Sequence, residues 1–186
     1  MSIRVPCRLF ALALVCSGLA QAAPILMSRE AVLLDFAPGG GQIYRYSYTL
    51  SGATLLRNQE IDIRFEPANY RSLANAVAGP GFDVLLLQPD NPPGSPGDLS
   101  ILALIDNPSL LSPFRVDAIY IGQGTPGPQP FSINQLDEDG RITSVIASGF
   151  AQAPVPEPAG WMLGWLGLAS LVFGKALRRL RRRAAR

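Results

Sequence analysis

The chain has 186 residues, enough for one ordinary domain, and much of its 48% hydrophobic content lies at the two ends. From Ala23 to Pro158 it carries 14 acidic residues and 7 arginines, a net charge of −7, whereas 7 basic residues and no acidic ones follow Pro158. The basic residues therefore form a tail of the kind found beside membranes, and we expect no nucleic-acid partner.

The first 22 residues predict a cleavable signal peptide. Arg4 and Arg8 precede an apolar stretch over residues 9–19. Small side chains follow at Ala20 and Ala22, where signal peptidase reads them, so we expect cleavage between Ala22 and Ala23. The alternative is a permanent anchor, but this stretch has 11 residues and a membrane span needs about 20.

Both cysteines, Cys7 and Cys16, lie within this leader, and the chain has no histidine. After cleavage the protein would hold no thiol, no disulfide and no soft metal ligand. We therefore expect neither a cofactor nor a metal site.

Residues 23–153 alternate between apolar and polar side chains, which is the pattern of β-strands. In the segment 59–66, Ile61, Ile63 and Phe65 share one face, and the charged residues between them share the other. Seven or eight short strands separated by turns predict an antiparallel β-sandwich. The expected strands cover residues 31–36, 42–50, 59–66, 82–87, 99–106, 114–121, 131–136 and 141–150.

Glycine and proline mark the connections between these segments. Gly39-Gly40-Gly41 predicts a turn before the strand at 42–50, and Asp139-Gly140 predicts the turn of a hairpin. The strand that begins at Leu99 is apolar on both faces, so we expect an interior position in its sheet. A short helix is expected over residues 69–78.

Three tyrosines, Tyr44, Tyr46 and Tyr48, share one face of the strand at 42–50. An exposed face of this kind could stack on sugar rings of an extracellular polysaccharide. Alternatively the three rings pack inward as part of the core or flank a neighbouring strand.

Little catalytic chemistry can be assembled from the mature sequence, because histidine and cysteine are absent and no glycine-flanked serine motif occurs. Carboxylates are the remaining option: Asp62 and Glu66 share a strand face, as a glycosidase pair would. The acidic run Asp137-Glu138-Asp139 could bind calcium but lacks the spacing of a known loop. For both groups we favour a solvated face or a polar turn.

The C-terminal segment predicts one transmembrane helix over residues 159–177. Its 19 residues would form a helix of roughly 28 Å, close to the hydrocarbon thickness of a bilayer. Positive charge after a span stays in the cytoplasm, so everything before Pro158 is placed outside it. The topology-setting residues are Arg178, Arg179, Arg181, Arg182 and Arg183.

The tripeptide Pro156-Glu157-Pro158 stands just before this helix, and its prolines hold the glutamate in an extended conformation. The order of tripeptide, short apolar helix and arginine-rich end resembles the PEP-CTERM sorting domain, also called the ice-binding protein C-terminal domain. The resemblance covers the last 32 residues, Val155 to Arg186. It implies that exosortase, a membrane cysteine protease, recognises Pro156, Glu157 and Pro158 and processes the tail. No threonine-rich ice-binding surface is apparent in the sequence.

The sequence thus predicts a signal peptide (1–22), an exported β domain (23–153) and a sorting segment (154–186). The expected function is non-enzymatic: the protein would span the inner membrane once and then pass to the cell surface or extracellular polysaccharide matrix. The expected partners are signal peptidase, exosortase and the inner membrane. The alternatives are a carbohydrate-binding module, a permanently tail-anchored surface protein and an enzyme that uses carboxylates.

Overall fold

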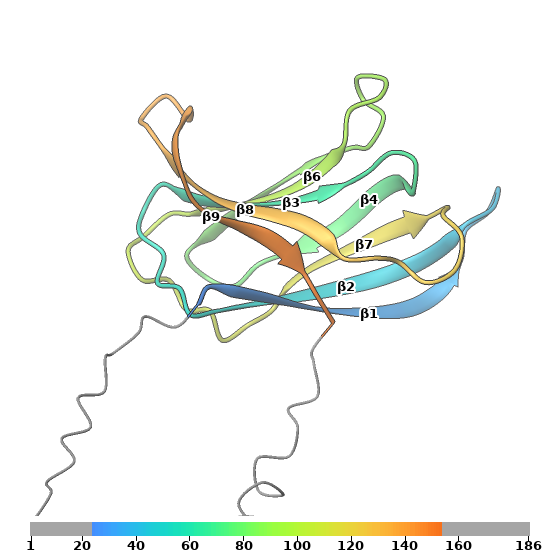
Figure 1. Cartoon of the computed structure of the whole chain (residues 1–186), viewed down its shortest axis with the longest axis horizontal. Coiled ribbons are helices and arrows are strands. Elements are labelled where there is room, and N and C mark those ends of the chain that lie inside the picture. The colour runs from blue at the N-terminus through green and yellow to red at the C-terminus, as the bar shows by residue number, and fades with distance from the viewer. Residues whose placement is uncertain (1–23, 154–186) are drawn as a thin grey trace, which may run out of the picture.

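The computed structural model describes residues 24–153, and this part forms nine β-strands and no helix (Figure 1). The strands are β1 (Leu26–Phe36), β2 (Gln42–Ser51), β3 (Gln59–Phe65), β4 (Tyr70–Val77), β5 (Phe82–Leu87), β6 (Gly97–Ala103), β7 (Phe114–Tyr120), β8 (Gln129–Leu136) and β9 (Ile142–Ala151).

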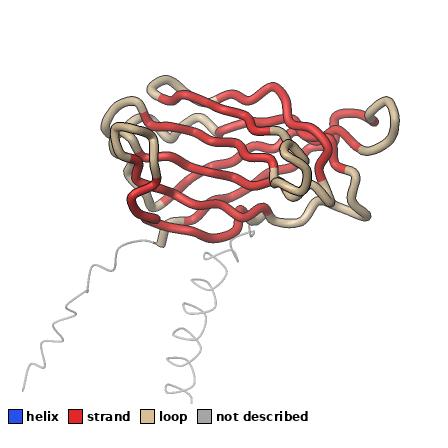
Figure 2. The backbone as a smooth tube through the Cα atoms, turned by 90° about the horizontal axis from the view of Figure 1, so that it is seen from above, coloured by secondary structure: helices blue, strands red, loops and turns tan. Residues whose placement is uncertain are grey.

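The strands form two sheets. One has four strands in the order β1-β2-β7-β4, and the other has five in the order β5-β6-β3-β8-β9. Every pairing within the two sheets is antiparallel. Figure 2 shows how much of the described part is strand, with loops at the strand ends. The predicted all-β fold with antiparallel sheets is confirmed.

Apolar side chains from both sheets meet in one core. Ile61, Ile63 and Phe65 of β3 are fully buried there, whereas Arg64 between them is exposed on the other face. Tyr46 of β2 and Val116 of β7 contribute to the same core from the four-stranded sheet. The period of two read from residues 59–66 is therefore correct, because this strand has one face in the core and one face outside.

Strand β6 takes the interior position that its sequence predicted, between β5 and β3. Its Leu99 and Ile101 lie in the core. The strand nevertheless ends at Ala103, earlier than expected, and Leu104 and Ile105 beyond it are exposed.

The helix expected over residues 69–78 is wrong, since this segment is strand β4, paired with β7. Register shifts interrupt that pairing between Tyr70 and Ser72 and between Ala74 and Val77. As a result the buried residues Tyr70 and Leu73 stand three apart, which is the spacing of a helix face. The bulges thus gave a strand the periodicity of a helix.

Strand β1 begins five residues earlier than the predicted segment, which started at Ala31. In the additional part, Met27 and Arg29 face inward and are buried. An arginine at an inward position breaks the apolar alternation, so the pattern did not identify the start of the strand.

Two predicted turns are confirmed. The chain reverses over Gly39–Gly41, and a side chain on Gly41 would place its Cβ 2.9 Å from the carbonyl oxygen of Tyr120. Gly140 has a φ of 76° in the turn that joins β8 to β9. Both positions require glycine because of the left-handed backbone, and the first also because of the close approach of β7.

Candidate functional site

The two ends of the described chain meet at the edge of the four-stranded sheet. After β9 the chain turns toward β1, where Gln152 and Ser28 form a parallel bridge (Figure 1). The Arg29 backbone N–H donates to the Gln152 carbonyl oxygen at 2.6 Å, and the Gln152 N–H donates to the Met27 carbonyl oxygen at 3.2 Å. These are the last backbone hydrogen bonds of the described chain before the predicted sorting segment.

A groove of about 530 Å³ opens beside the bridge. None of its lining residues is charged, although the described part of the chain carries many charges. Leu26 and Phe150 at the groove are each 58% exposed. Serine, glycine and glutamine complete a lining whose apolar members are Ile25, Leu26, Met27, Phe131, Phe150 and Ala153.

The Arg29 side chain points from β1 into the interior and is only 9% exposed. Its guanidinium donates to the carbonyl oxygens of Pro126, at 3.1 Å, and Gly127. It also donates to Oε1 of Gln129 at 3.1 Å, and its Cζ lies 5.7 Å from the ring centre of Tyr46, within cation–π range. The side chain thereby fastens the loop before β8 to the first strand.

This arginine is buried without an opposite charge. Among residues 24–153 no carboxylate forms an ion pair with Arg29, and its Nε has no hydrogen-bond partner. A buried cation is costly unless hydrogen bonds compensate it, so the two carbonyl groups and the glutamine carry that role here.

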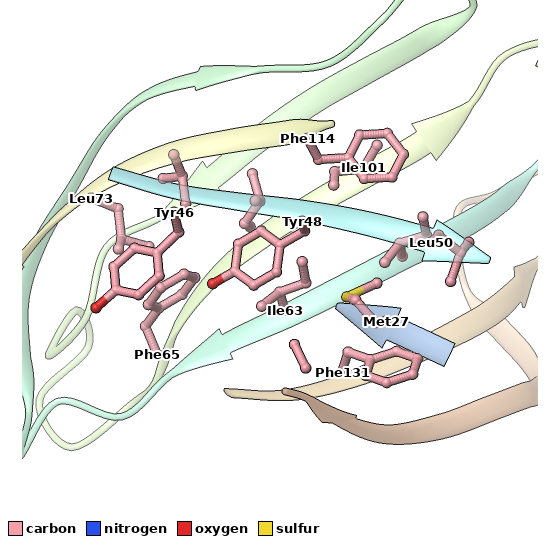
Figure 3. Close-up of a cluster of buried hydrophobic side chains, with 14 of the residues drawn as sticks. Met27, Tyr46, Tyr48, Leu50, Ile63, Phe65, Leu73, Ile101, Phe114 and Phe131 are labelled. Carbon is pink, nitrogen blue, oxygen red and sulfur yellow. The ribbon is translucent and has the colours of Figure 1, made fainter. Parts of the chain in front are cut away.

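The three tyrosines of β2 do not form an exposed platform. Tyr46 and Tyr48 are fully buried and only Tyr44 is partly exposed. Figure 3 shows the first two side by side, next to Phe65 and Ile63. A sugar ring cannot stack on Tyr46 and Tyr48 in the folded domain, so the proposed glycan face is wrong for these two and the alternative, inward packing, is confirmed.

All five tyrosines of the chain belong to one aromatic cluster, because Tyr70 of β4 and Tyr120 of β7 join those of β2. The hydroxyl oxygens of Tyr46 and Tyr70 lie 3.3 Å apart, and Gln129 bonds the hydroxyls of Tyr48 and Tyr70. Burial raises the pKa of Tyr46 and of Tyr48 well above the usual range for a phenol. These hydroxyls therefore stay protonated and act as hydrogen-bonding groups of the core.

The carboxylates of β3 lie on the outer face of the five-stranded sheet. Burial raises the pKa of Asp62 to about 6, and the charges of Glu60 and Asp98 add to this shift. Asn134 donates from Nδ2 to Asp62 Oδ2 at 2.6 Å. Glu66, predicted on the same strand, lies one residue beyond the end of β3. Four residues of extended chain place its Cα roughly 13 Å from that of Asp62, wider than the spacing of two carboxyls that flank one glycosidic bond.

The acidic run before Gly140 builds the turn between β8 and β9. Oδ1 of Asp137 accepts the backbone N–H groups of Asp139, at 3.0 Å, and Arg141, at 2.8 Å. Within residues 24–153 no group of three or more possible ligand side chains is arranged to hold a metal ion. This geometry favours the polar turn over a calcium loop.

The predicted processing residues lie outside the described residues. These are the signal cleavage site Ala22 and Ala23, the tripeptide Pro156, Glu157 and Pro158, the helix at 159–177, and Arg178, Arg179, Arg181, Arg182 and Arg183. Between residues 24 and 153 the structure contains no helix of the length and apolarity that a membrane crossing requires.

No protein-family model, curated protein or solved structure matches this chain. The resemblance of the tail to a sorting domain therefore depends on its own residues.

The sequence did not indicate that the two ends of the described chain pair at Ser28 and Gln152, the place called here the junction of chain ends. Arg29 precedes the predicted start of its strand at Ala31, and Gln152 stands alone between two alanines after the last predicted strand. A parallel bridge of two residues leaves no periodic pattern in the sequence and becomes visible only in the folded structure.

Proposed function

We propose that this protein is a non-enzymatic exported β domain, held in the inner membrane by its tail and then sorted by exosortase to the cell surface or extracellular polysaccharide matrix. The observation that carries the proposal is the three-part tail, which begins directly after the folded domain. Gln152 makes the last backbone hydrogen bonds of the described chain, and Pro156-Glu157-Pro158 follows within six residues. The recognition residues are thus close to the domain, yet beyond its last described strand.

The position of the chain ends supports this topology. Ile25, near the proposed signal cleavage site, and Ala153, near the sorting segment, line the same groove. A domain with its two ends on one side can present both processing sites to the same membrane.

The interior of the domain favours a non-enzymatic role. The hydroxyls of Tyr46 and Tyr48 are buried and stay protonated because burial raises their pKa, and the Asp137 carboxylate is used in a turn. Asp62 and Glu66 are too far apart to act together on a glycosidic bond. The chain has no histidine and both cysteines lie in the predicted leader, so neither residue type can supply a base or a thiol nucleophile to the mature domain.

Mass spectrometry of the mature protein tests the proposal. In cells with active exosortase we expect a mature protein that begins at Ala23 and has lost the C-terminal tail that ends at Arg186. The variant Glu157→Ala should retain the full tail, because the acidic recognition residue is lost. Glu138→Ala, which removes an exposed carboxylate in the β8–β9 turn, is the matched control and should be processed normally.

An intact C-terminus in the unaltered protein would contradict sorting and favour a permanent tail anchor. Normal processing of Glu157→Ala would show that the tripeptide is not the recognition element.

A further inference from the structure

We infer that the uncharged groove between β1 and the end of β9 is the membrane-facing surface of the domain, with Leu26 and Phe150 docking into the headgroup region of the bilayer. The inference rests on the proposed function, because it requires that the tail span the membrane. It adds a lipid partner and a contact surface that the tail alone does not define.

The length of the connecting chain limits how far this groove can lie from the membrane. Five residues, 154–158, separate Ala153 from the predicted helix that begins at Ala159. An extended chain covers roughly 20 Å over this span. Part of that length, about 5–8 Å, is taken up by the headgroup layer itself. Ala153 lines the groove, so the groove is held close to the lipid surface.

The chemistry of the groove matches such a surface. Residues 24–153 carry 13 acidic residues and 7 arginines, a net charge of −6, and none of these residues lines the groove. An acidic surface is repelled by anionic headgroups, whereas an uncharged one can approach them. Of the groove residues, Leu26 and Phe150 are the large apolar side chains that are mostly exposed. Apolar side chains of this kind partition into the boundary between headgroups and acyl chains.

The neighbouring edge strand β1 also has exposed apolar side chains. Beyond the bridge, Val32 and Phe36 are exposed, at 48% and 65%, together with the acidic residues Glu30 and Asp35. The β8–β9 turn, which holds the acidic run at 137–139, lies on the opposite side of the domain in Figure 1. The two sides thus differ in charge, because the turn is acidic and the groove is uncharged, although Ile142 and Val145 beside the turn are exposed as well.

Depth-dependent fluorescence quenching tests the inference. The mature chain, from Ala23 to Arg186, has no cysteine, so Leu26→Cys, Phe150→Cys and Glu138→Cys each give one labelling site. Each labelled protein is inserted into phosphatidylethanolamine and phosphatidylglycerol vesicles that carry a nitroxide on the headgroup in both leaflets. Labels at 26 and 150 should lose most of their emission, and the label at 138 should keep it. Because all three positions are exposed, none of the substitutions disturbs the core.

A second variant separates docking from chance proximity. Adding Leu26→Glu to the Phe150→Cys protein should restore the emission of the label at 150, because a charge at the groove opposes contact with lipid. Unquenched labels at 26 and 150 on a chain that floats with the vesicles would overturn this inference and leave the sorting proposal intact. A chain that does not float with the vesicles would overturn both. Equal quenching at 138 would also contradict a specific face.

Discussion

The tyrosine cluster and the junction of chain ends lie in the same sandwich and use their aromatic and polar groups in opposite ways. In the cluster, the ring centre of Tyr46 lies 5.9 Å from that of Phe65 and 6.1 Å from that of Tyr70. Its hydroxyl is hydrogen-bonded to the hydroxyl of Tyr70 inside the core. At the junction, Phe150 is 58% exposed and the backbone of Gln152 holds the end of the chain by two hydrogen bonds.

The difference teaches that aromatic content alone does not indicate a binding face. Tyr46 and Tyr48 stabilise the interior, whereas the exposed side chains of Leu26 and Phe150 stand where the chain leaves the domain. Arg29 connects the two regions, since its side chain contacts the cluster and its backbone binds Gln152.

Truncation in the cluster should have the largest effect. Tyr46→Ala removes a fully buried ring, and loss of a buried aromatic costs about 3–5 kcal/mol of unfolding free energy. Urea unfolding followed by near-ultraviolet circular dichroism measures the change. Tyr44→Ala is the matched control and should cost less, because that ring is partly exposed. Equal losses for the two variants would mean that the cluster is not a core element.

Removal of the connecting arginine should have an intermediate effect. Arg29→Ala leaves the carbonyl group of the buried Pro126 without this donor, which we expect to lower the unfolding free energy by about 2 kcal/mol. The Gly127 carbonyl keeps a second donor, Nε2 of Gln129, at 2.9 Å. Arg71→Ala is the control, because Arg71 also donates to loop carbonyls, those of Gly39 and Gly40, but at the surface, where water can replace it. Hydrogen exchange should quicken in the loop over 122–128 for Arg29→Ala only. If both variants behave alike, burial of Arg29 has no energetic role.

A change at the junction should have the smallest effect. Gln152→Pro removes the N–H that donates to Met27, a loss of about 1 kcal/mol. Ala153→Pro is the matched control, since alternate residues of a strand direct their N–H groups to opposite sides. Exchange at the Arg29 amide, read by nuclear magnetic resonance, should quicken in the first variant and stay unchanged in the second. The reverse order would show that the bridge has a different register.

Several strands could be predicted because their side chains alternate between a more buried and a more exposed face. The segment 82–87 matches β5 at both ends, and Ile61, Ile63 and Phe65 lie inward as their alternation indicates. Prediction failed where the backbone departed from the regular period. Bulges in β4 spaced Tyr70 and Leu73 as a helix would, and the inward Arg29 concealed the start of β1.

For the candidate site, the sequence predicted the processing residues around Glu157 but not the surface beside them. Leu26 and Phe150 are separated by more than a hundred residues and come together only when β9 ends beside β1. A local sequence pattern cannot predict that these two side chains meet, because their approach depends on how the two sheets pack against each other.

The sequence by itself determined that residues 23–153 would be an all-β domain, since the period of its side chains requires strands with an inner and an outer face. It also determined several turns, because glycine accepts a left-handed backbone with the least strain at positions such as Gly140. Only the tertiary structure decided that Tyr46 and Tyr48 face the core and that Gln152 is tied to β1. The physical reason is that burial and edge pairing depend on which sheet packs against a given face. The local order of side chains does not determine that packing.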